Sequence, residues 1–191
     1  FAVPYNASVG NYQVTFFNRQ VLADAGYNDD TLYQLQADGK WNWDKFREIA
    51  SAATDLDKGI YGTAFGQTIE NFVYANDAAF FEKVDYDGTI IEQFAGNKRN
   101  AVEAWEFLLN MAGEGWVNTE LYQGDNYLSA AFFRGELAMM CTWAARAADQ
   151  DTKGLDYGIL YIPKGPQAED YSSAVIEYNP FGIYKGHANP E

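Results

Sequence analysis

The chain has 191 residues, of which 48% are hydrophobic, and it carries a net charge of −14 at pH 7. This length fits one sizeable domain or one lobe of a larger protein, and the hydrophobic share excludes a disordered chain. The acidic balance argues against a nucleic-acid partner, which would need clustered Lys and Arg. The single Cys141 excludes an internal disulfide and indicates a buried thiol, and the single His187 leaves no histidine-rich metal site. We therefore expect no metal and no cofactor.

Aromatic side chains make up 17% of the residues. They provide large, stiff contact areas, and Tyr and Trp add a polar group. Composition leaves two interpretations open. The aromatic residues either build a surface for a sugar or another polar organic ligand, or they only fill a Tyr-rich core and surface.

The first third of the chain predicts a strand over 11–18 and a short helix over 19–26. A loop rich in Asn and Asp is expected next. It leads to a helix over 43–54, which Asn42 can cap. The apolar residues of that helix recur on one face, so Trp43 is predicted to lie in the core, and core packing is also the simplest role for Trp41.

The middle of the chain predicts a short strand between the glycines of 59–66 and a helix over 67–81. A hairpin-like turn is expected around Asp87-Gly88. The clearest helix covers 100–112. Its inner face carries Ala101, Trp105, Leu108, Leu109 and Ala112.

The last third predicts a helix over 126–135, then an apolar strand from Leu137 to Cys141 that runs into Thr142 and Trp143. A strand over 156–163 follows, and two short strands are expected on either side of Asn179-Pro180. Because strands alternate with helices along the chain, the fold class is α/β.

No motif for catalysis stands out. The sequence contains no phosphate-binding loop, no zinc spacing and no Gly-x-Ser-x-Gly elbow. A glycosidase needs two facing carboxylates, and the acids that we would place near a cleft are Glu70, Asp77 and Glu177. Their spacing singles out no acid–base pair. A glycosidase-like α/β enzyme domain is therefore the alternative hypothesis, and a structural or adhesive surface domain is a third.

Five stretches, taken in order, resemble the extracellular solute-binding proteins of ABC importers, the group that includes maltose-binding protein. Each is similar to a recurrent segment of that family, and together they span nearly the whole chain: FAVPYNASVGNYQVTFFNRQVLADAG, WNWDKFREIASAATD, FFRGELAMMCTW, LDYGILYIPKGP and HANPE.

The resemblance implies a fold and a function. In that family two α/β lobes close on a solute about a hinge. Residues 1–191 would form the second, C-terminal lobe, with a central, mostly parallel sheet of about five strands and helices on both faces. The first lobe and the C-terminal helices would lie outside this sequence. The protein would be a non-catalytic monomer that captures a carbohydrate and delivers it to the membrane subunits of an ABC transporter. It would work outside the cytoplasm, in the periplasm or lipid-anchored at the outer face of the cell membrane.

The resemblance also implies three walls of a ligand cleft. Trp143 would stack on the solute beside Arg146, although Trp143 comes earlier than in the family pattern, which leaves its direction open, and the alternatives are a core tryptophan and a solvated arginine. The second wall would be the start of the 67–81 helix, where capping alone would also explain Thr68. The third lies before Pro180, where a simple turn is the alternative. The residues of the second and third walls are Gln67, Thr68, Glu70, Asn71, Glu177, Tyr178 and Asn179.

Overall fold

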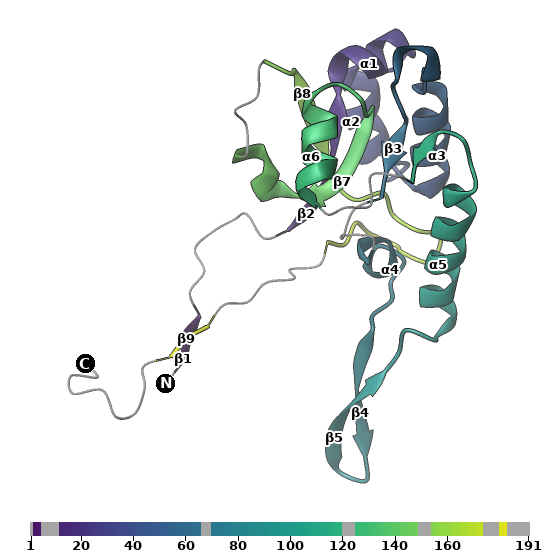
Figure 1. The fold of residues 1–191 in the computed structure, drawn as a ribbon. Coiled ribbons are helices and arrows are strands. Elements are labelled where there is room, and N and C mark those ends of the chain that lie inside the picture. Colours follow the sequence, from purple (N-terminus) through teal and green to yellow (C-terminus); the bar gives the residue numbers. More distant parts are fainter. Residues whose placement is uncertain are drawn as a thin grey trace, which may run out of the picture.

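A computed structural model describes residues 2–4, 12–65, 70–119, 125–148, 154–173 and 180–182 (Figure 1). The strands are β1 Ala2–Pro4, β2 Gln13–Asn18, β3 Thr63–Ala64, β4 Phe81–Tyr86, β5 Thr89–Phe94, β6 Val117–Asn118, β7 Met139–Trp143, β8 Tyr157–Leu160 and β9 Pro180–Gly182. The helices are α1 Arg19–Asp24, α2 Asp29–Ala37, α3 Trp43–Ala52, α4 Asn71–Tyr74, α5 Arg99–Ala112 and α6 Asp125–Phe133, with short 3-10 turns η1 Leu56–Lys58 and η2 Ala144–Ala148.

The centre of the fold is a three-stranded sheet in the order β7-β2-β8, and both of its pairs are antiparallel. The prediction of a central, mostly parallel sheet is therefore not confirmed, because β2 runs against both neighbours. Strand β2 lies in the middle of the three, so both pairs of this sheet differ from the predicted parallel arrangement.

A second pair extends this layer beyond β7. Strand β3 pairs with β6 in parallel, and the segment leading into β3 meets the segment leading into β7 in a parallel bridge between Tyr61 and Leu137. The Ala138 N–H donates to the Tyr61 carbonyl at 2.8 Å, and the Met139 N–H donates to the Gly62 carbonyl at 3.0 Å. Strands β7, β8, β3 and β6 consequently share one direction, and β2 opposes them.

Asparagine caps start the first three helices. The side chains of Asn18, Asn28 and Asn42 accept hydrogen bonds from backbone N–H groups of the first turns of α1, α2 and α3, at 3.2, 2.9 and 3.0 Å. Helix α2 corrects the sequence prediction, which expected a loop here. The Asn and Asp residues that indicated a loop are its N-cap and an acidic first turn, a composition that loops and helix starts share.

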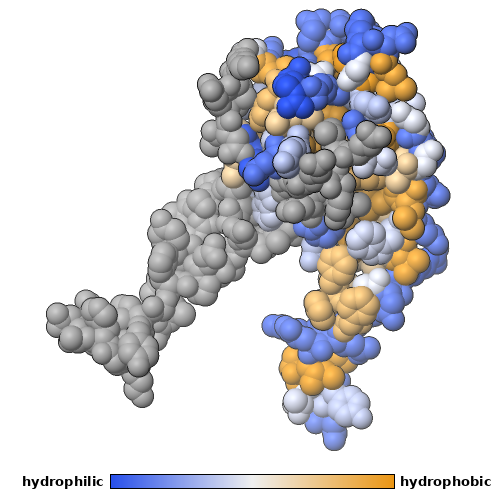
Figure 2. Space-filling view, in the orientation of Figure 1, coloured by the Kyte–Doolittle hydropathy of each residue, from blue (hydrophilic) through white to orange (hydrophobic). Residues whose placement is uncertain are grey.

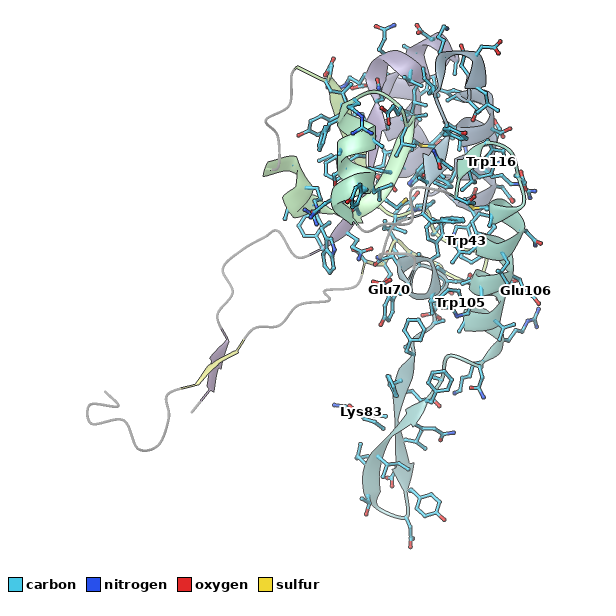
Figure 3. All side chains as sticks on the ribbon, in the orientation of Figure 1. Trp43, Glu70, Lys83, Trp105, Glu106 and Trp116 are labelled. Carbon is cyan, nitrogen blue, oxygen red and sulfur yellow. The ribbon has the colours of Figure 1, made fainter. Side chains whose placement is uncertain are left out.

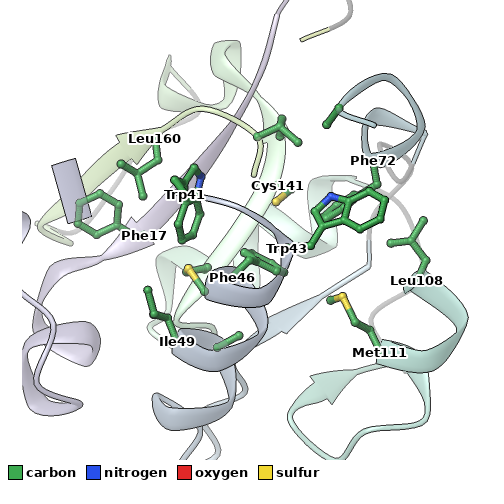
Figure 4. Close-up of a cluster of buried hydrophobic side chains, with 14 of the residues drawn as sticks. Phe17, Trp41, Trp43, Phe46, Ile49, Phe72, Leu108, Met111, Cys141 and Leu160 are labelled. Atoms are coloured by element: carbon green, nitrogen blue, oxygen red, sulfur yellow. The ribbon is translucent and has the colours of Figure 1, made fainter. Parts of the chain in front are cut away.

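The sheet carries helices on both faces, as predicted. One face packs on α6 through Val14, Phe16 and Met140, which meet Leu128 and Phe132. The other face packs on α2, α3 and α5. Its larger cluster holds Phe17, Leu32, Trp41, Trp43, Phe46, Ile49, Phe72, Leu108, Met111, Cys141 and Leu160 (Figure 4). The core positions predicted for Trp41 and Trp43 are confirmed, since they are 0% and 5% exposed.

The long helix predicted over 100–112 is confirmed as α5, with two differences on its inner face. Ala101, Leu108 and Met111 are buried, but Leu109 is 71% exposed. The helix lies against one flank of the fold, so its buried stripe is narrower than the apolar pattern. Trp105, predicted to be buried, is half-buried and packs with its ring centroid 6.3 Å from that of Phe80 (Figure 3).

Strands β4 and β5 form an antiparallel hairpin that projects from the body of the fold (Figure 1). Its turn, Asp87-Gly88, was predicted from the sequence and has positive φ at both residues, 52° and 82°. The helix predicted over 67–81 is shorter in the structure, because the chain leaves it to enter the hairpin. Within the described residues α4 covers only Asn71–Tyr74, because Asp77 takes a left-handed φ of 52° and the chain then extends into β4. Residues 67–69 of the predicted helix lie outside the described residues.

At the chain ends β1 pairs with β9 in antiparallel fashion, with Val3 opposite Phe181. These two strands run side by side, away from the three-stranded sheet (Figure 1). Among the helices described here, none is long and apolar enough to span a bilayer.

Candidate functional site

The candidate site lies along one edge of the sheet layer. Since β3, β6, β7 and β8 share a direction and β2 opposes them, four carboxyl ends and the start of β2 lie along the same edge. In α/β sheets, ligands bind outside the carboxyl ends of the strands. This rule points to the edge formed by the ends of β7 and β6 and the start of β2.

Trp143 is the last residue of β7 and lies opposite Gln13, the first residue of β2. Alternate residues of a strand share a face, so its side chain leaves the sheet on the same side as Cys141, toward the larger core cluster. The side chain is half-buried rather than enclosed. Directly beyond it the Ala144 N–H donates to the Tyr12 carbonyl at 2.9 Å, which holds the strand end in place.

Arg146 lies in η2, the turn that follows Trp143 without a break, and is also half-buried. The backbone thus carries an indole and a guanidinium to one edge of the sheet. A ring of this kind offers an apolar face, and a guanidinium offers planar donors. The sequence predicted that these two groups would meet a solute, and that role stays a prediction.

The second predicted wall is described in part. Glu70 is the N-cap residue of α4, is half-buried and makes no side-chain cap hydrogen bond (Figure 3). Asn71 begins the helix and is 0% exposed. Burial, with a smaller contribution from the charge of Glu70, raises the pKa of Tyr74 on the same helix. Gln67 and Thr68 lie outside the described residues, as do Glu177, Tyr178 and Asn179 of the third wall, so those five remain predictions.

Two polar residues at this edge were missed by sequence reasoning. Gln13 and Thr142 are both 0% exposed, on opposite faces of the sheet. Neither the Gln13 carboxamide nor the Thr142 hydroxyl has a hydrogen-bond partner in the part of the chain that the structure describes. The sequence did hold a signal for Gln13, which is a long polar side chain inside an otherwise apolar strand.

Of the acids considered for catalysis, Glu70 and Asp77 are described and Glu177 lies outside the described residues. Asp77 lies at the base of the hairpin, where it lines a hollow of about 600 Å³ together with Glu82 and Lys98. Glu82 is committed to an ion pair with Lys98 at 2.5 Å. Asp77 therefore lies beside an ion pair at the base of the hairpin.

Comparison with known proteins decides the family. The sequence profile described as "Bacterial extracellular solute-binding protein" matches residues 1–191. The chain belongs to this family. No individually curated protein matches it in sequence. The family is defined by binding solutes rather than by converting them, so the expectation of a non-catalytic protein holds and the glycosidase-like alternative finds no support.

Solved structures share the fold of this solute-binding chain. The ABC substrate-binding protein Lmo0181 from Listeria monocytogenes, in complex with cycloalternan, superposes with a TM-score of 0.65 at 19% identity, over 87% of this chain and 40% of that one. The GacH receptor of Streptomyces glaucescens, studied with acarbose, gives 0.60 at 18% identity over 91% and 41%. UgpB from Mycobacterium tuberculosis, in complex with glycerophosphocholine, gives 0.64 at 19% identity over 87% and 38%. The chain therefore spans about two fifths of the length of these structures.

Proposed function

We propose that this chain is the second lobe of an extracytoplasmic solute-binding protein that captures a carbohydrate. The observation that carries the proposal is the position of Trp143, a half-buried indole at the carboxyl edge of the sheet with Arg146 in the turn beyond it. Sugar rings present apolar C–H faces and a rim of hydroxyl groups. An aromatic face beside a planar donor suits both features.

Family membership and coverage support the same proposal. The chain matches the family profile from end to end, yet it covers only 40% of the Lmo0181 structure. A lobe of a two-lobe protein would give this coverage. Its paired end strands β1 and β9 would then be the crossings to the other lobe, and closure about them would bring a second wall onto the solute.

The ligands of similar structures favour a carbohydrate over other polar solutes. Cycloalternan and acarbose are sugars or sugar analogues, although one similar structure holds glycerophosphocholine. We further propose that the protein acts as a monomer and delivers its solute to the membrane subunits of an ABC transporter. A lipid anchor or a periplasmic location would keep it outside the cytoplasm.

A thermal-shift screen of the full-length protein tests the proposal. Oligosaccharides with different linkages form the test set, and glycerophosphocholine is the control for a polar solute without a sugar ring. We expect at least one oligosaccharide to raise the melting temperature and to shift tryptophan fluorescence, with no hydrolysis product by chromatography. Stabilisation by glycerophosphocholine alone would contradict a carbohydrate ligand, and a hydrolysis product would contradict a binding protein.

A further inference from the structure

Gln13 opens strand β2 with a polar side chain that solvent does not reach, since the residue is 0% exposed. Its backbone is well held, because its N–H donates to the Ser173 hydroxyl at 2.9 Å and its carbonyl accepts from the same hydroxyl at 2.8 Å. The side chain differs. Within the described residues neither its Nε2 nor its Oε1 has a hydrogen-bond partner. Buried polar groups in native proteins are nearly always paired with protein, water or ligand.

The next residue on the same face shows what the fold does where no ligand is involved. The Thr15 hydroxyl lies 3.4 Å from the Cys141 sulfur and donates to the Tyr161 carbonyl at 3.1 Å. The sheet therefore satisfies the inner polar side chain of β2 and leaves the outer one, at the edge, unsatisfied. The carboxamide at this edge is therefore available to a partner from outside the chain.

The register of the sheet fixes where that partner would lie. Gln13 is directly opposite Trp143 on the antiparallel β2–β7 pair, so both side chains leave the same face at the same edge. Side chains directly opposite one another are close neighbours in such a pair. A solute ring placed against Trp143 would put its rim groups beside Gln13, and the side chains that bury the carboxamide would have to move aside for them to reach it.

We propose that Gln13 is a specificity-determining residue, whose carboxamide hydrogen-bonds a hydroxyl group of the solute, directly or through one ordered water. The inference rests on the proposed carbohydrate function and adds a residue to that site. A carboxamide donates through nitrogen and accepts through oxygen, and a hydroxyl group does both. A neutral amide adds no charge, so it favours neutral, polyhydroxylated solutes over anionic or cationic ones.

Two substitutions in the full-length protein test this proposal. Gln13→Met keeps an unbranched side chain of similar length and removes the amide. Thr15→Val is the matched control, because it removes a hydroxyl on the same strand and face whose bonds are internal. The probes are the oligosaccharide that stabilises the wild type most and its singly deoxygenated analogues, measured by isothermal titration calorimetry. Urea unfolding without ligand is measured on each variant.

For Gln13→Met we expect affinity for the parent sugar to fall about tenfold or more, because the sugar hydroxyl would be buried without its hydrogen-bond partner. One deoxygenated analogue, bound weakly by the wild type, should be bound equally by both proteins. The urea midpoint of Gln13→Met should stay the same or rise, since an unpaired buried amide has gone. Thr15→Val should lower the urea midpoint and leave affinities within about twofold.

The outcomes separate this inference from the function on which it rests. If the wild type binds sugars and Gln13→Met keeps every affinity within about twofold while its urea midpoint falls, Gln13 holds only a structural water and the inference is wrong. A result in which no oligosaccharide binds the wild type would overturn both the proposed function and the role of Gln13.

Discussion

Two tryptophans of this chain should respond in opposite ways to replacement by alanine. Trp43 is 5% exposed, stacks on Phe107 with ring centroids 4.5 Å apart and planes 14° apart, and touches Phe72 at 6.3 Å. Trp143 is half-buried at the edge of the sheet. The first belongs to the core by every contact it makes, and the second lies where we propose that a ligand stacks.

The structure sets the magnitudes. Removing a buried Trp costs about 3–5 kcal/mol of stability, and an aromatic pair adds about 0.5–1.5 kcal/mol beyond the buried area, so Trp43→Ala should fall at or above the upper end of that range. Trp143→Ala removes less buried surface and should cost clearly less. It should instead weaken solute binding by about 1–3 kcal/mol, the scale of covering an aromatic face.

Urea unfolding and calorimetric titration of the full-length variants measure the two effects. If Trp143→Ala keeps the affinity of the wild type and lowers the free energy of unfolding as much as Trp43→Ala does, Trp143 is a core residue. The ligand wall would then have to be sought at Arg146 and Asn71 instead. A loss of affinity with nearly intact stability would support stacking.

Three further outcomes follow from the packing. Gly62→Ala should destabilise the fold by about 1–3 kcal/mol, because a Cβ there would lie 2.2 Å from the Ala50 carbonyl oxygen, whereas Gly115→Ala, with nothing within 4 Å, should not. Burial raises the pKa of Cys141 from 9.0 to about 12. The unfolded thiol ionises first, so the free energy of unfolding should fall as pH rises through this window, and Cys141→Ala should lack that contribution. Limited proteolysis should cut the 81–94 hairpin before α5, since an isolated two-stranded hairpin is marginally stable, and protection there would reveal a covering partner.

The predicted elements that proved right are those whose signal is local. Asn42 followed by an apolar stripe is enough to start α3, and Asp87-Gly88 is enough to turn the β4–β5 hairpin, because capping and positive φ depend on neighbouring residues only. The same signals failed where they are ambiguous. Asn28 with its acidic neighbours fits a loop and a helix start equally well, and α2 was missed for that reason.

What could not be predicted depends on contacts distant in sequence. The direction of a strand in a sheet is set by which partner it meets, and β2 meets β7 and β8, more than a hundred residues along the chain. Leu109 repeats with its helical stripe but faces outward, because α5 is covered on one side only. The hairpin likewise exposes aromatic and aliphatic side chains (Figure 2). A sequence pattern can show that a face is apolar, but it cannot show whether another part of the protein packs against that face.

Trp143 comes earlier in the sequence than the family pattern places its tryptophan, so it still lies within strand β7. The effect of this position on the direction of the indole can be tested by exchanging Trp143 with its neighbour Thr142. Because Trp143 still belongs to β7, the pleat fixes its side, and a shift of one residue would turn the ring toward α6, where Thr142 is 0% exposed. In the double variant Thr142→Trp with Trp143→Thr, the composition is unchanged but the indole enters the packed face around Phe16 and Leu128. Overpacking there should cost about 1–3 kcal/mol of stability, and solute binding should be lost. A double variant that keeps wild-type affinity would mean that the indole needs no particular face, and the stacking geometry proposed for this edge would be wrong.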